Sequence, residues 1–168
     1  MSQTTLPSPA ASTTIYAARR IITVNPSRPQ ASHVAVRDGR ILAVGNLDEL
    51  SAWGPHQLDD RFADKLLMPG LIEGHGHLCF DATPGWRATF DGETPGTMLL
   101  RMAGNARKML EAGITTVRDL GAPTAASIEL RDATRAHLLE GPRLLISGAP
   151  ITTTGGHCWF MGGECDGE

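Results

Sequence analysis

The segment spanning residues 69–77, PGLIEGHGH, constrains the fold of this chain more than any other stretch. Pro69-Gly70 is a strong turn signal, and the short apolar run after it predicts a strand. Successive side chains of a strand point to opposite faces, so His75 and His77 should share one face, about 6.6 Å apart along the backbone. A bare His-x-His pair also occurs by chance in surface strands. The strand and its turn favour a pair of metal ligands instead.

Downstream of this segment, helical and extended patterns alternate. The expected elements are a helix over 97–111, a strand over 114–121, a helix over 124–138 and a strand over 143–148. Gly113 stands where a glycine would end the first helix, and Thr124 is a candidate cap for the second. Strand, helix, strand, helix, strand at this spacing predicts a parallel α/β sheet.

Two long segments show no regular pattern. Residues 78–96 directly follow the histidine strand and read as a long loop, and residues 149–168 read as a glycine-rich loop after the third strand. In a parallel barrel both would lie at the carboxyl ends of the strands, where active sites are built.

The first third of the chain reads as a small antiparallel sheet. Residues 14–24 are rich in β-formers, and residues 61–67 return as extended chain. Between them, Asp38-Gly39 separates alternating apolar residues, which is the signature of a two-residue hairpin. Residues 1–13 are rich in Ser, Thr, Pro and Ala, and we expect them to form a flexible tail.

The PGLIEGHGH segment resembles the first barrel strand of the amidohydrolase superfamily, whose usual form is Pro-Gly-Leu/Phe-Ile-Asp-x-His-x-His. Glu73 replaces the more usual aspartate, a mild departure because that residue precedes the ligands. Residues 113–119, GITTVRD, and 154–157, TGGH, are most similar to the branch that holds imidazolonepropionase-related enzymes and metal-dependent dipeptidases.

The resemblance implies an α/β fold: the N-terminal part of a (β/α)8 TIM-like barrel, about three strands, preceded by a small β-sandwich segment. The expected domains are a tail over 1–13, the sandwich segment over 14–66 and the first βα units of the barrel over 67–168. A complete barrel needs about 200 residues or more. We therefore expect this chain of 168 residues to be the N-terminal portion of a longer or split hydrolase, with the barrel incomplete.

The resemblance also implies the site. His75 and His77 would bind one or two divalent ions, expected to be Zn²⁺, and the other ligands and the catalytic base would come from strands beyond residue 168. Asp119 would orient a ligand histidine, or else cap the next helix or pair with Arg118. His157 would bind a substrate carbonyl or carboxylate, unless it is simply a surface loop residue.

The implied activity is metal-dependent hydrolysis of an amide bond, in a dipeptide or an N-acyl amino acid, by metal-activated water. One alternative is a non-catalytic barrel fragment or subunit, which would carry an apolar open face on its first and third barrel strands. Another is a cyclic-amide hydrolase or deaminase of the same superfamily.

The composition of the chain limits the binding partners and the cellular location that we expect. A net charge of −3 without a basic cluster argues against nucleic acid and anionic membranes. No apolar stretch approaches the roughly 18 residues of a transmembrane helix. Three cysteines, an odd number, favour a reducing compartment, so we expect a cytoplasmic protein. The expected partners are a small amide or peptide substrate, the rest of the barrel from the same or another chain, and further copies in a homo-oligomer when complete.

Overall fold

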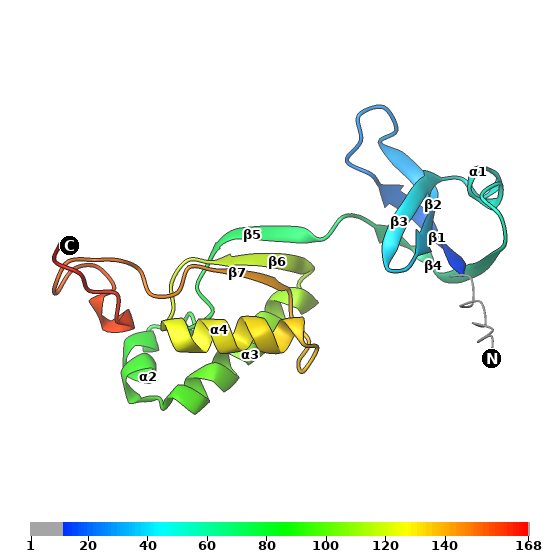
Figure 1. Cartoon of the computed structure of the whole chain (residues 1–168). Helices are drawn as coiled ribbons and strands as arrows, with labels where there is room; N and C mark the ends of the chain where they lie inside the picture. Colours follow the sequence, from blue (N-terminus) through cyan, green and yellow to red (C-terminus); the bar gives the residue numbers. More distant parts are fainter. Residues whose placement is uncertain (1–11, 168) are drawn as a thin grey trace, which may run out of the picture. The chain divides into compact units, whose positions relative to one another are not determined.

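The computed structural model describes residues 12–167 and divides the chain into two compact units, Met1–Pro69 and Gly70–Glu168. The units meet in sequence between Pro69 and Gly70, where the expected turn does not form, and each carries its own sheet (Figure 1). Most of the expected N-terminal tail, residues 1–11, lies outside the described residues, and Thr13 already begins the first strand.

The first unit is a four-stranded sheet with one short helix. Its elements are β1 (Thr13–Ile22), β2 (Gln30–Arg37), β3 (Arg40–Gly45), α1 (Leu47–Ser51) and β4 (His56–Leu67). The strand order is β3-β2-β1-β4, and the expectation of a purely antiparallel sheet is wrong because β4 pairs with β1 in parallel. Parallel neighbours need a crossover connection, and the chain that leaves β1 returns to it only through β2, β3 and α1.

The hairpin between β2 and β3 forms as the sequence predicts. Asp38 and Gly39 take φ values of 51° and 69°, the positive range that a two-residue turn of this kind requires. A small core of Ile15, Ala35 and Leu50 lies between this sheet and α1. The unit therefore has a hydrophobic centre of its own.

The second unit is an α/β layer. Its elements are β5 (Leu71–Gly76), α2 (Trp86–Gly92), α3 (Pro95–Glu111), β6 (Ile114–Asp119), α4 (Thr124–Arg135), β7 (Arg143–Ile146) and the 3-10 turn η1 (Trp159–Met161). The three strands are all parallel, in the order β5-β6-β7, and α3 and α4 lie along the same side of the sheet (Figure 1). This confirms the α/β fold with three barrel-type strands that do not close into a barrel.

The core of this unit explains why α3 forms where its apolar stripe predicts. Met102 and Ala106 are fully buried and belong to the same cluster as Val117 of β6 and Leu130 of α4. The helix begins after Thr94, whose hydroxyl accepts a hydrogen bond from the Thr97 amide at 3.2 Å. It ends before Gly113, which takes a φ of 87°, as a terminating glycine does.

Three local expectations are wrong. The loop over 78–96 contains the helix α2, because Trp86 and Phe90 pack against other aromatic rings. The helix expected over 124–138 stops at Arg135, and Thr124 does not cap it: the Thr124 hydroxyl accepts a hydrogen bond from the Ala149 amide at 3.0 Å instead. The loop over 149–168 holds the short turn η1.

The sheet of the second unit has apolar side chains on its two outer strands. Ile72 of β5 is 74% exposed and Leu145 of β7 is 53% exposed, which is the apolar open face that the barrel-fragment alternative predicts. In the part of the chain that the structure describes, no helix combines the length and the apolar character needed to span a membrane.

Candidate metal centre

His75 and His77 lie at the carboxyl end of β5, with an exposed and a half-buried side chain respectively. Their ring centroids are 5.3 Å apart and the ring planes meet at 65°. With metal–nitrogen bonds of about 2.1 Å, two imidazoles on one tetrahedral ion have ring centroids about 5 Å apart. The observed spacing fits a shared divalent ion.

The His77 ring is also in the tautomer that a metal ligand needs. Its Nδ1 lies 3.1 Å from the carbonyl oxygen of Gly121. A carbonyl oxygen only accepts hydrogen bonds, so Nδ1 carries the proton and the neutral ring presents the lone pair of Nε2. Backbone carbonyls fix ligand histidines in this way in many metal sites.

Asp119, the last residue of β6, is 1% exposed and binds two backbone amides. One carboxylate oxygen accepts from the Leu78 amide at 3.3 Å, and the other from the Gly121 amide at 3.1 Å. It thus ties down the peptide that follows His77 and the residue whose carbonyl holds the His77 ring. Burial raises the pKa of the Asp119 carboxyl, while the Gly121 and Leu78 amides act to lower it.

Asp119 makes neither of the alternative contacts that the sequence left open. The Arg118 guanidinium donates to the carbonyl oxygen of Gly74 at 2.7 Å. Helix α4 has Pro123 at its N-cap and no side-chain capping bond there. The carboxylate is committed to the backbone around His77.

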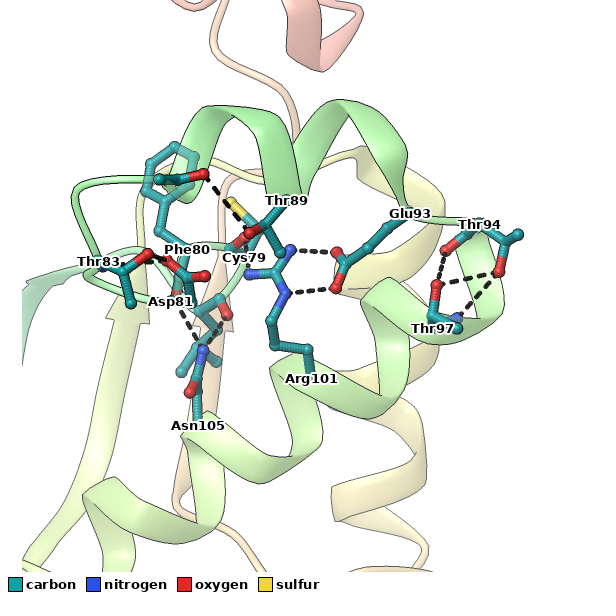
Figure 2. A network of polar contacts seen from close by, with 12 residues as sticks. Cys79, Phe80, Asp81, Thr83, Thr89, Glu93, Thr94, Thr97, Arg101 and Asn105 are labelled. Carbon is teal, nitrogen blue, oxygen red and sulfur yellow. Dashed lines mark hydrogen bonds and ion pairs between the residues drawn. The ribbon is translucent and has the colours of Figure 1, made fainter.

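Helix α3 binds the backbone that follows His77, through two residues that the sequence analysis did not identify. Asn105 donates to the carbonyl oxygens of Leu78 and Phe80, at 3.0 and 2.7 Å, and Arg101 donates to that of Cys79 (Figure 2). Three successive carbonyls are therefore bound by side chains one helical turn apart. The only signal in the sequence is a polar pair beside the apolar stripe of α3.

Arg101 is itself held by Glu93. Its Nε donates to a Glu93 carboxylate oxygen at 2.7 Å, and both side chains are only 15% exposed. The Arg101 hydrogen bonds lower the pKa of the Glu93 carboxyl. Cys79, whose carbonyl is the middle one of the three, donates its thiol hydrogen to the Gly121 carbonyl oxygen with Sγ at 3.3 Å, and burial raises the pKa of the thiol to about 12. The Cys79 thiol therefore has a structural role, as a buried hydrogen-bond donor.

A cavity of about 730 Å³ opens beside the two histidines. His75, His77 and His157 all line it, so the structure brings three of the four candidate residues to one space, while Asp119 is buried and does not line the cavity. The remaining lining residues are Phe80, Trp86, Leu120, Pro150, Cys158 and Phe160. They come from the segments after β5, β6 and β7, which is the end of a parallel sheet where ligands bind.

Among residues 12–167, the candidate ligands that lie together are the two histidines of the β5 end. No group of three or more His, Cys, Asp or Glu side chains in this range is placed to hold one ion. Catalytic zinc sites usually have three protein ligands. The two histidines are one fewer than this usual number.

Residues 66–168 match the model of the amidohydrolase family. Over 47 residues the chain is 43% identical to imidazolonepropionase of Pyrobaculum arsenaticum, covering 28% of this chain and 12% of that protein. Over 59 residues it is 39% identical to the protein LONG AFTER FAR-RED 3 of Arabidopsis thaliana, covering 34% and 10%.

Solved structures resemble most of the described fold. A prolidase complexed with N-methylphosphonate-L-proline matches 87% of this chain with 28% identity and a TM-score of 0.67. A Xaa-Pro dipeptidase with bound methionine matches 92% with 24% identity and a TM-score of 0.64, and a molinate hydrolase matches 84% with 24% identity and a TM-score of 0.68. The chain spans 34%, 37% and 31% of these structures, respectively, and about a tenth of the two curated relatives.

Proposed function

Because the chain belongs to the amidohydrolase family, we propose that it forms one side of the active site of a metal-dependent hydrolase that cleaves amide bonds. The observation that carries the proposal is the histidine pair at the end of β5. The two rings have the spacing of ligands to one ion, and His77 is held as the tautomer whose Nε2 can bind it.

On this proposal, His75 and His77 hold a divalent ion, and imidazole ligands suit Zn²⁺ among the common metals. A bound divalent ion polarises a carbonyl group and lowers the pKa of water at the site toward neutrality. Whether one ion or two are bound depends on ligands from outside residues 12–167.

The other residues have supporting roles. The Gly121 carbonyl keeps the proton of His77 on Nδ1, and Asp119 fixes the two peptides on which that contact depends. His157 lines the same cavity with an exposed side chain and can donate a hydrogen bond to a substrate carbonyl or carboxylate oxygen. On this proposal, Gly121 and Asp119 position His77, and His157 contacts the substrate and not the metal ion.

We propose a dipeptide or an N-acyl amino acid as the substrate. The similarity to a prolidase at 28% identity supports this class. A second candidate is a cyclic-amide hydrolase or deaminase of the same superfamily, which the stretch 43% identical to an imidazolonepropionase favours.

We also propose that residues 14–66 are the N-terminal β-sandwich segment and residues 67–168 the first βα units of a barrel. The remaining ligands and the catalytic base would then come from further strands, in the same polypeptide or in another chain. The open edges of β5 and β7 are compatible with added strands, since parallel sheets of this type continue by edge pairing.

The test is the metal content of the purified protein, read by native mass spectrometry. Wild type is expected to carry a divalent ion, and the double variant His75→Ala/His77→Ala should lose it. His56→Ala, an exposed histidine at the start of β4, is the matched control and should keep it. A double variant with full metal content would contradict the proposal. Dipeptides and N-acyl amino acids are then assayed with the full polypeptide.

A further inference from the structure

The cavity beside the histidines has an aromatic wall, formed by Phe80, Trp86 and Phe160. Phe80 and Trp86 come from the segment after β5, and Phe160 comes from η1, after β7. The ring centroids of Phe80 and Trp86 are 4.7 Å apart, and those of Trp86 and Phe160 are 5.9 Å apart. Two loops that are distant in sequence thus build one continuous aromatic surface.

This aromatic wall is supported from behind. Phe90 is 7% exposed, and its ring centroid lies 5.1 Å from that of Phe160 in an edge-to-face contact. The Arg87 guanidinium lies 3.9 Å from the Phe160 ring centroid, and its Nε donates to Asp91 at 2.7 Å. A surface fixed in this way costs little ordering when a ligand binds.

The described lining of the cavity also contains no Asp, Glu, Lys or Arg side chain. The polar groups that line it are the imidazoles of His75, His77 and His157 and the thiol of Cys158. The carboxylate of Asp81 and the ammonium of Lys108 line a neighbouring cavity of about 660 Å³, which shares His77, Phe80 and Trp86 with the first. The aromatic rings themselves offer a charged substrate group no hydrogen bond or counter-charge, so an uncharged apolar group fits them better.

We propose that the aromatic wall binds an uncharged, apolar group of the substrate, an aryl or branched aliphatic group on one side of the scissile amide. Trp86 and Phe160 are then specificity-determining residues. This inference rests on the proposed function, because it places the scissile bond beside His75 and His77. It narrows the substrate class to amides with a hydrophobic group on that side.

The experiment measures binding of three small amides to the full polypeptide by ligand-observed NMR, with and without added Zn²⁺. The probes are N-benzoylglycinamide, N-acetylglycinamide and N-succinylglycinamide, which differ only in the acyl group. We expect the benzoyl probe to bind about tenfold more tightly than the acetyl probe, which is the value of one aromatic contact. The negatively charged succinyl probe should bind no better than the acetyl probe.

Variants locate the binding surface. Phe160→Leu and Trp86→Leu keep an apolar side chain but lose the ring, and each should weaken benzoyl binding by about fivefold to tenfold. Trp159→Leu is the control, because Trp159 neighbours Phe160 in η1, is 48% exposed and does not line the cavity. It should change benzoyl binding by less than about twofold. Thermal unfolding of all three variants checks that the fold is kept.

Equal binding of the benzoyl and acetyl probes would overturn the inference, as would an equal loss in Trp159→Leu. The proposed function fails separately. If the polypeptide hydrolyses benzoyl and acetyl amides with equal kcat/KM, the proposed function stands, but the aromatic wall does not determine specificity. Selective benzoyl binding without metal or hydrolysis would keep the binding surface and reject the function.

Discussion

The Nδ1 of His77 donates a hydrogen bond to the carbonyl oxygen of Gly121 at 3.1 Å, which joins the end of β5 to the turn after β6. The contact fixes both the tautomer and the direction of the ring. Asp119 accepts hydrogen bonds from the amides of Leu78 and Gly121, and Asn105 of α3 donates to the carbonyl of Leu78, the residue after His77. The candidate ligand is therefore supported by three separate elements of the second unit.

Asp119→Asn tests the buried carboxylate. The amide keeps the size of the side chain, but its NH₂ group must face the amide of Leu78 or Gly121, so two donors oppose each other. We expect a loss of about 1–3 kcal/mol in the free energy of unfolding. Metal affinity should fall by about tenfold to a hundredfold, as when the supports of other metal ligands are removed.

Urea denaturation and a metal titration measure both effects. Asp132→Asn serves as the control, because that exposed carboxylate on α4 pairs with the adjacent Arg131. Unchanged metal affinity in Asp119→Asn, with wild-type affinity in the control, would show that Asp119 has no part in positioning His77.

Asn105→Leu tests the clamp from α3. The substitution keeps the branched shape and the number of heavy atoms but leaves the carbonyl oxygens of Leu78 and Phe80 without their donor. We expect about 1–3 kcal/mol of lost stability, the cost of leaving buried acceptors unpaired. Lys108→Leu, at an exposed position of the same helix, should stay within about 0.5 kcal/mol of wild type. A loss in Asn105→Leu no larger than in the control would remove the clamp as a stabilising element.

Local sequence patterns were enough for the parts of the fold that depend on neighbouring residues. Alternation along the strand predicted that His75 and His77 share a face, and both line one cavity. The Asp38-Gly39 hairpin follows in the same way from turn chemistry. The stripe of α3 and its terminating Gly113 were equally readable.

The parts that could not be predicted depend on contacts between distant segments. Asn105 binds carbonyl oxygens 25 and 27 residues away, and no pattern marks a side chain that binds backbone. Helix α2 is stabilised by rings from another loop, including Phe160, so its own sequence reads as a loop. Threonine is a common helix cap, but the Thr124 hydroxyl accepts a hydrogen bond from the Ala149 amide instead of capping α4.

The Glu93–Arg101 pair should make stability depend on pH. The Arg101 guanidinium lowers the pKa of the Glu93 carboxyl below its ordinary value of 4.5. A depressed pKa in the folded state means that the pair stabilises the protein above pH 4.5 and that this contribution is lost as the pH falls through the lower folded value. Unfolding midpoints measured between pH 6 and pH 3 should show the loss.

Glu93→Gln isolates this contribution. The variant should be less stable than wild type at pH 6, and the difference should shrink toward pH 3. Glu111→Gln removes the partner of Arg107 in a pair whose side chains are 60% and 67% exposed, so it should change stability very little. A constant difference between Glu93→Gln and wild type across this range would contradict the ion-pair explanation.

Gly121→Ala tests the close approach of His77 to the turn after β6. A Cβ at this position would lie 3.1 Å from both Cε1 and Nδ1 of His77 and 3.1 Å from a ring carbon of Pro150, so the imidazole must shift by a few tenths of an ångström. The shift would strain the hydrogen bond from His77 Nδ1 to the Gly121 carbonyl, which orients the ring. We expect metal affinity to fall about tenfold in a titration, with a smaller effect on the unfolding midpoint.

Gly104→Ala in α3 is the control, because a Cβ there meets nothing within 4 Å and an alanine should stabilise the helix by about 0.5–1 kcal/mol. If Gly121→Ala binds metal as well as Gly104→Ala does, the exact placement of the His77 ring is not what the site depends on.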